Sequence, residues 1–114
     1  MANGASIADV RRLYGLYKRR YYSEYALPAA DEVVLSWFTH PHLLGRSTRM
    51  PDPDHDEPEA SIELHEVLRR LPRLLSLILM HEMSHIAFPR LNHGRGWRKE
   101  ANRLGALGAM EEFF

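Results

Sequence analysis

The 114-residue sequence contains no cysteine, no long apolar segment and no excess of charge of either sign. Without cysteine the chain has no disulfide, no four-cysteine zinc module and no cysteine nucleophile. No apolar segment reaches the roughly 20 residues that span a bilayer. Fifteen basic and fifteen acidic side chains balance, so the overall charge predicts neither a nucleic-acid nor a membrane partner.

The beginning of the sequence also lacks a secretory signal, because MANGASIADV has no basic stretch followed by an apolar one. We therefore expect a cytoplasmic protein. The length suits one domain with a single hydrophobic core. We expect that domain to occupy residues 1–114, with loose ends at about 1–6 and 109–114.

The most informative stretch is His81-Glu82-Met83-Ser84-His85, which directly follows the longest apolar run, Leu74 to Met80. In a helix, His81 and His85 are one turn apart and project from the same face. Two imidazoles placed in this way can bind one metal ion. Glu82 is turned by about 100° from His81, so it lies beside the metal without having to be a ligand.

His93 is the predicted third ligand, because Pro89, Asn92 and Gly94 indicate a turn that brings the chain back to the metal. Three protein ligands and a fourth position that keeps a water are typical of catalytic zinc sites. Glu82 is then the general base that takes the proton of this water as it attacks a metal-polarised carbonyl. The pattern predicts one Zn²⁺ per chain, held by His81, His85 and His93.

The alternative interpretation is a pair of histidines and a glutamate on a partly exposed helix, since HExxH is a short pattern that also occurs by chance. The apolar surroundings favour the metal site. Unpaired His and Glu side chains there would cost on the order of several kcal/mol in desolvation. No spacing rule identifies a donor for the oxyanion, and Arg95 and Tyr22 are the candidates.

The segment HEMSHIAFPRLNHGRGWRKEANRLGALG resembles the catalytic end of SprT-like zinc metalloproteases, which share HExxH, a later His-Gly and an aromatic residue a few positions beyond. The similarity extends upstream, more weakly. Tyr14 to Tyr25 resembles the family's first helix, and Val33 to Trp37 resembles its first strand. Leu44 to Arg46 resembles its LGR element, and Ile62 to Leu64 with Leu68 to Pro72 resembles the strand and lead-in before the active-site helix. The resemblance implies a zinc metalloendopeptidase that acts on a protein or peptide substrate.

DNA is a candidate partner by the same resemblance, because SprT-like proteases include enzymes that act on DNA-bound proteins. Arg11, Lys18, Arg19 and Arg20 belong to the basic and aromatic cluster of the N-terminal segment and are the candidate nucleic-acid contacts. A solvated helix face is the alternative. The zinc ribbon found C-terminal to the protease domain in many relatives is excluded by the absence of cysteine, which leaves any dependence on DNA open.

The expected fold class is α+β. Ser6 and Asp9 predict the N-terminus of a helix that runs from about Ile7 to Tyr25. Strands are predicted at 32–39, 43–50 and 60–65, the short helical or turn segment at 66–71, and helices at 72–88 and 95–107. Together these make a minimal zincin-like domain with an N-terminal helix, a small two- or three-stranded sheet, a buried HExxH helix and a C-terminal supporting helix.

Three further expectations concern the surroundings of the site. The strand at 60–65 is expected to be an edge strand that holds an extended peptide substrate. The acidic, proline-rich stretch 51–58 is expected to be a loop beside the cleft. His40-Pro41-His42 is predicted to be a loop rather than a second metal site, because no partner ligands stand at fixed spacing.

Two rival functions use the same residues. One is a non-catalytic zincin-like module that binds metal for stability or binds a protein. The other is metal-dependent hydrolysis of a substrate other than a peptide. Structural zinc sites usually have four protein ligands, often including cysteine, so three histidines and a base favour catalysis.

Overall fold

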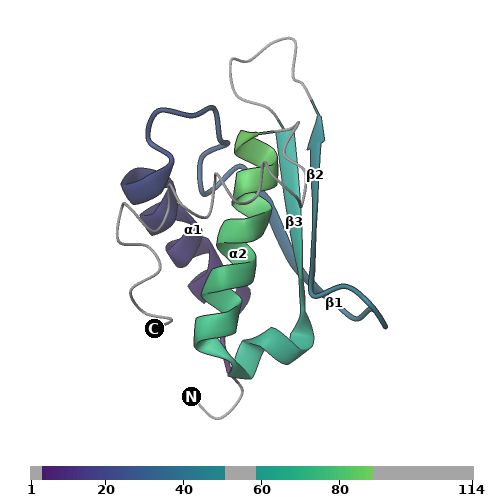
Figure 1. Ribbon diagram of the computed structural model, residues 1–114. Coiled ribbons are helices and arrows are strands. Elements are labelled where there is room, and N and C mark those ends of the chain that lie inside the picture. Colours follow the sequence, from purple (N-terminus) through teal and green to yellow (C-terminus); the bar gives the residue numbers. More distant parts are fainter. Residues whose placement is uncertain (1–3, 51–58, 89–114) are drawn as a thin grey trace.

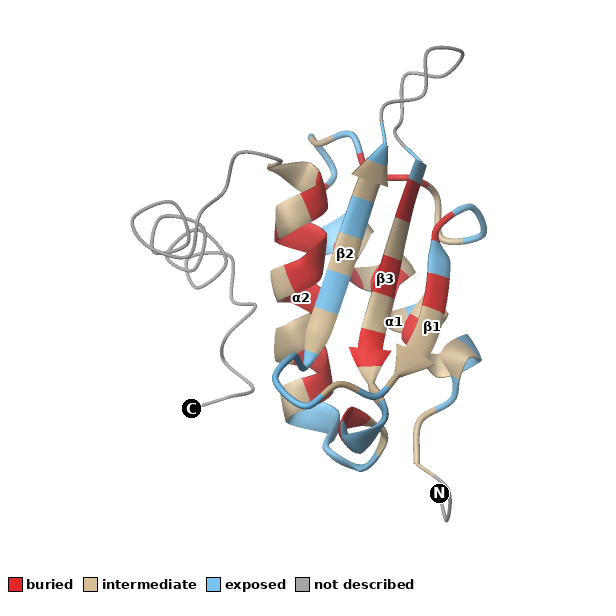
Figure 2. Cartoon of the chain, turned by 90° about the vertical axis from the view of Figure 1, so that its right-hand side faces the viewer, coloured by how far each residue is buried: buried red, intermediate tan, exposed pale blue. Residues whose placement is uncertain are grey.

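The computed structural model describes residues 4–50 and 59–88, and within these ranges the chain forms two α-helices and a three-stranded mixed sheet. The elements are, in chain order, α1 (Ile7–Tyr21), β1 (Val34–Phe38), β2 (Gly45–Met50), β3 (Glu59–His65), the 3-10 helix η1 (Glu66–Arg70) and α2 (Pro72–Ala87). Both α-helices lie against the same face of the sheet (Figures 1 and 2). The predicted α+β class is thereby confirmed.

The central strand of the sheet is β3, which pairs in parallel with β1 and antiparallel with β2. The prediction that the strand at 60–65 lies at an edge is therefore wrong, and β2 is the edge strand on the side of α2 (Figure 2). Alternation of apolar residues shows that one face of a strand is buried, but it does not distinguish an edge from a centre, which depends on pairing with distant segments.

The helix-facing side of the sheet changes in character from β3 to β2. On β3 this side carries Ala60, Ile62 and Leu64, which are all buried. Residues that face each other in an antiparallel pair lie on the same side of a sheet. The partners of these three on β2 are Arg49, Ser47 and Gly45, in that order. The side of β2 that faces α2 is consequently small and polar, whereas that of β3 is apolar.

Helix α1 begins with the predicted capping box. The Ser6 hydroxyl oxygen accepts a hydrogen bond from the Asp9 amide at 3.2 Å, and the Asp9 carboxylate accepts one from the Ser6 amide at 2.9 Å. The bond from the Ser6 amide holds the pKa of the Asp9 carboxyl below its ordinary value. The helix ends at Tyr21, earlier than the predicted end at Tyr25, because Tyr22 leaves the helical conformation and its side chain enters the core.

Buried tyrosine hydroxyls of this N-terminal segment fix one side of α2. The Tyr17 hydroxyl donates to Ser76 Oγ at 2.8 Å. The Tyr22 hydroxyl donates to the Met80 carbonyl oxygen at 3.0 Å and lies 2.7 Å from Ser84 Oγ. These contacts span more than one turn of α2, so the rotation of α2 about its axis is set by directional bonds as well as by apolar packing.

The other predicted elements agree with the structure where it describes them. The helix predicted at 72–88 is α2, with Pro72 in its first turn, and the segment predicted at 66–71 is η1. His40 and His42 lie in a loop, where His40 Nδ1 accepts the amides of His42 and Leu43. The predicted loop 51–58 and helix 95–107 lie outside the described residues. No described helix is long and apolar enough to cross a membrane.

The contact between Tyr22 and α2 predicts a measurable loss of stability in Tyr22→Phe. This change removes a fully buried hydroxyl and its bond to the Met80 carbonyl, which we expect to lower the free energy of unfolding by about 1–2 kcal/mol. Urea unfolding followed by circular dichroism measures this. Ser23→Ala, which removes an exposed hydroxyl from the adjacent position, should change stability by less than about 0.5 kcal/mol. Equal effects of the two changes would contradict the role assigned to Tyr22.

Candidate metal centre

The two histidines of the HExxH motif converge on a different side of α2 from Ser76 and Met80, which contact the tyrosines. Both histidines are half-buried, and their Nε2 atoms lie 3.1 Å apart, with ring centroids separated by 4.7 Å and planes inclined by 75°. Spacing of four residues brings the two side chains to one face, and their rotamers then turn the same nitrogen of each ring toward a common point.

This geometry fits the requirements of a tetrahedral metal ion. Zinc–imidazole bonds of about 2.0–2.1 Å at a tetrahedral angle place two ligand nitrogens about 3.3–3.4 Å apart. The separation of 3.1 Å between the Nε2 atoms of His81 and His85 is close to this value. The pair could accept one ion with a small outward rotation of the rings.

Glu82 lies beside the histidine pair and is turned toward β2. The residue is only 6% exposed, and the Ser47 hydroxyl donates to its Oε1 at 3.0 Å. At 3.6 residues per turn, Glu82 lies about 60° around α2 from His85 and about 100° from His81. A buried carboxylate is costly unless hydrogen bonds compensate for its lost hydration, and Ser47 supplies one of them.

Gly45 permits the close approach of β2 to this carboxylate. A Cβ atom at Gly45 would lie 2.8 Å from Glu82 Oε2 and 2.8 Å from Ile78 Cγ2, closer than such atoms approach in folded proteins. Any side chain at this position would therefore displace the Glu82 carboxylate or push β2 away from α2. The glycine acts here by its small size, since it adopts an ordinary backbone conformation.

Sequence reasoning did not identify Gly45 and Ser47 as site residues. The sequence GRSTRM does carry a signal, because small, polar or charged residues occupy the first five of its six positions, although the strand packs against an apolar helix. Reading that signal requires the register of β2 on β3, which places Gly45 and Ser47 opposite the buried Leu64 and Ile62. The pairing is long-range and is not encoded in the spacing of the strand itself.

The predicted third ligand, His93, lies outside the described residues. Within residues 4–50 and 59–88, no group of three or more His, Asp or Glu side chains is arranged to hold a metal ion. The described part of the centre is thus two convergent imidazoles and one neighbouring carboxylate. Two ligands alone do not hold zinc tightly, so the proposed site needs a third ligand. The sequence predicts that this third ligand is His93.

Of the two candidate oxyanion donors, Tyr22 is described and Arg95 is not. Tyr22 is fully buried, and its hydroxyl contacts Met80 and Ser84 on the α1 side of α2. Because His81 and His85 project from a different side of the helix, this hydroxyl stabilises the packing of α2 and is not directed at the metal pair.

The four candidate nucleic-acid contacts lie on α1 in different surroundings. Arg11 is half-buried, and its guanidinium donates to the carbonyl oxygens of Ala30 and Val33, the latter at 2.9 Å. Arg19 and Arg20 are exposed, and Lys18 is half-buried. The guanidinium of Arg11 thus fixes the loop that precedes β1, whereas Arg19 and Arg20 are open to solvent.

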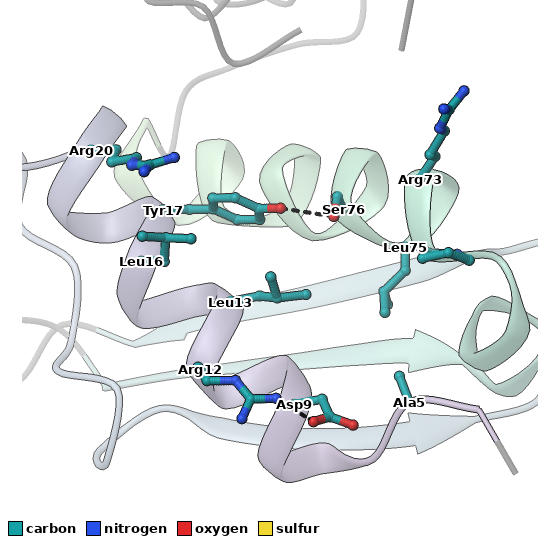
Figure 3. A pocket seen from close by; sticks show the side chains of 11 residues that line it. Ala5, Asp9, Arg12, Leu13, Leu16, Tyr17, Arg20, Arg73, Leu75 and Ser76 are labelled. Carbon is teal, nitrogen blue, oxygen red and sulfur yellow. Dashed lines mark hydrogen bonds and ion pairs between the residues drawn. The ribbon is translucent and has the colours of Figure 1, made fainter. Parts of the chain in front are cut away.

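A hollow of about 370 Å³ lies between α1 and the first turns of α2 (Figure 3). Leu13, Leu16 and Leu75 line it, and arginines 12, 20 and 73 contribute charge at its border. Ser76 is the lining residue nearest in sequence to His81, and five residues of helix separate the two by about 7.5 Å along the axis. The hollow is therefore distinct from the histidine pair.

No protein-family model, no curated protein and no solved structure matches this chain. The assignment of a function to the centre consequently depends on the chemistry of its residues.

The close contact at Gly45 predicts opposite effects of alanine at two glycines. Gly45→Ala should lower the free energy of unfolding by about 1–3 kcal/mol, because the added methyl group has no space beside Glu82 and Ile78. Gly15→Ala should raise it by about 0.5–1 kcal/mol, because Gly15 lies inside α1 and its added Cβ would meet other atoms only at 3.5 Å or more. Urea unfolding of both variants measures these changes. A Gly45→Ala protein as stable as the wild type would contradict the close steric contact between β2 and Glu82.

Proposed function

We propose that this protein is a zinc-dependent metallopeptidase of the SprT-like, zincin type, with Glu82 as its general base. The observation that carries the proposal is the combination of two Nε2 atoms 3.1 Å apart with a neighbouring buried glutamate whose carboxylate is hydrogen-bonded to Ser47. A chance HExxH sequence on a surface helix requires neither the convergence nor the buried support of the glutamate.

In this proposal His81 and His85 hold the metal through Nε2, and His93 completes the set of protein ligands. A bound Zn²⁺ would polarise the substrate carbonyl and make an attacking water more acidic. Glu82 removes the proton from the water and then delivers it to the departing amine. Ser47 restricts the carboxylate to one orientation, so that Glu82 need not be reoriented for each turnover.

The edge strand β2 is the proposed place for an extended peptide. It pairs with β3 along one edge, and within the described residues no strand pairs with its other edge. Peptides often bind to proteins by adding a strand to such an edge. A peptide along β2 would run beside α2 (Figure 2), on the strand whose Ser47 hydroxyl contacts Glu82.

DNA remains a secondary proposal that depends on the exposed Arg19 and Arg20. These two side chains lie on the last turn of α1. Both are exposed in the part of the chain that the structure describes, so they are available for phosphate contacts. The rival function of a non-catalytic zincin-like module is less favoured, because such a module has no need of a buried carboxylate beside its metal ligands.

Metal content tests the ligand set. We expect about one zinc ion per wild-type chain by elemental analysis, and little in His93→Ala, because loss of one of three ligands removes most of the affinity. His42→Ala is the matched control, since His42 is exposed in a loop and should not affect zinc. Stoichiometric zinc in His93→Ala would indicate another third ligand. A wild-type chain that binds no zinc even after zinc addition would contradict the proposed function.

Glu82→Gln separates catalysis from metal binding. This change keeps the shape of the side chain and removes the base, so the variant should retain zinc while peptidase activity falls by about 100-fold or more. Glu66→Gln, at an exposed position of η1, should retain activity. Casein cleavage followed by gel electrophoresis, with zinc analysis on the same samples, measures both quantities. Undiminished cleavage by Glu82→Gln would exclude the mechanism.

A further inference from the structure

The side of β2 that faces α2 carries one charge beyond Gly45 and Ser47. Arg49 is the antiparallel partner of Ala60, which is buried at 7% exposure on the helix-facing side of β3. Paired residues share a side of the sheet, so the Arg49 side chain is directed to the same side as Ser47. Arg49 is half-buried, whereas its neighbours Thr48 and Met50 are exposed, and this agrees with the placement.

The half-buried Arg49 side chain has one buried nitrogen, Nε, without a hydrogen-bond partner in the described part of the chain. Buried donors are almost always satisfied, and an unsatisfied one in a folded protein calls for an explanation such as a ligand. Burial without a partner costs more for a charged donor than for a neutral one.

The contrast with Arg46 on the same strand shows how an arginine of β2 is satisfied elsewhere. Arg46 points to the opposite side of the sheet, where its Nε and Nη2 donate to the two carboxylate oxygens of Glu63, each at 3.0 Å. These bonds raise the pKa of Arg46 above its ordinary value. Among the described residues, Arg46 is thus paired with a carboxylate, whereas the Nε of Arg49 has no hydrogen-bond partner.

The position of Arg49 relative to the catalytic residues follows from the direction of the two elements. The C-terminal ends of β2 and α2 lie at the same end of the molecule (Figure 1). Arg49 follows Ser47 by two residues, which is about 6.7 Å along the strand. It therefore lies beyond the contact between Ser47 and Glu82, in the direction of the His85 end of α2.

We propose that Arg49 binds a carboxylate of the substrate and thereby selects peptides with an acidic group close to the cleaved bond. This inference rests on the proposed peptidase function and on a peptide lying along β2. The planar guanidinium matches a carboxylate in a two-point contact, as the Arg46–Glu63 pair does on the other side of the sheet. The carboxylate comes from an aspartate or glutamate side chain or from a free C-terminus. The distance of about 6.7 Å from Ser47 places it one or two residues from the bond beside Glu82.

The test measures binding without turnover. The probes are mixtures of short peptides built from uncharged residues, with a single glutamate placed at each position in turn. Identical mixtures with glutamine in place of glutamate are the neutral counterparts. Every mixture is made once with a free C-terminus and once with an amidated one. Zinc-loaded Glu82→Gln protein should bind the best glutamate or free-acid mixture about 10- to 100-fold more tightly than its neutral counterpart, measured by calorimetry. Adding Arg49→Met should abolish that preference, and adding Arg49→Lys should retain part of it, because lysine keeps the charge without the planar fork.

Arg46→Met is the matched control, since Arg46 lies on the same strand but on the opposite side of the sheet. The preference should survive this change. An equal preference in the Arg49→Met and wild-type backgrounds, or no preference in either, would overturn the assignment of Arg49. A difference between the free and amidated series identifies which carboxylate is bound.

Cleavage of the same mixtures by the wild-type protein distinguishes this inference from the proposed function. If the wild type cleaves none of them, the peptidase proposal is wrong, while the calorimetry still decides whether Arg49 binds a carboxylate. If it cleaves them, the Arg49→Met change should reduce kcat/KM for the acidic mixture relative to the neutral one, mainly through KM. An equal fall in kcat for both mixtures would instead place Arg49 at the transition state and contradict a role in selection.

Discussion

The burial of the Glu82 carboxylate is the constraint on which the arrangement of the site depends. Glu82 is buried, so its carboxylate needs hydrogen-bond donors in place of water, and the Ser47 hydroxyl is one of them. This bond requires that β2 lie directly against α2, which is possible because Gly45 has no side chain. The position of Glu82 and the packing of the sheet edge are therefore determined together.

The helix that carries the motif is held on two sides by contacts of different kinds. On one side the hydroxyls of Tyr17 and Tyr22 bond to α2, and on another Ser47 bonds to Glu82. Since each of these bonds is directional, α2 cannot rotate without breaking several at once. The remaining face projects His81 and His85 toward a common point, so the positions of the two imidazoles follow from the anchoring of their helix.

Local signals in the sequence were sufficient to predict the elements but not their assembly. The capping box at Ser6 and Asp9, the proline at the beginning of α2 and the alternation in β3 are short-range patterns, and each predicted its element. The position of β3 at the centre of the sheet and the early end of α1 depend on long-range contacts, so they could not be inferred in the same way.

The same distinction applies to the candidate site. The spacing of His81, Glu82 and His85 predicted that the three side chains gather on one part of a helix, and the convergence of the imidazoles agrees with this. Ser47 and Gly45 come from a strand more than 30 residues earlier in the sequence and became recognisable as site residues only through the register of β2 on β3. The role of His93 rests on the sequence, because it lies outside the described residues.

The side of β2 that faces α2 is polar and contributes little to the apolar core. An edge strand that packs on a helix normally contributes apolar side chains to the core, as Ala60, Ile62 and Leu64 of β3 do. On β2 the equivalent positions are a glycine, a serine and an arginine, which bury little apolar surface and leave a charged donor unsatisfied among the described residues. A sequence selected for stability alone would carry valine or isoleucine at positions 47 and 49, whereas position 45 has no room for a side chain beside Glu82 and Ile78. The small and polar groups along one line, next to a buried glutamate and two convergent histidines, fit the proposed site for a polar substrate.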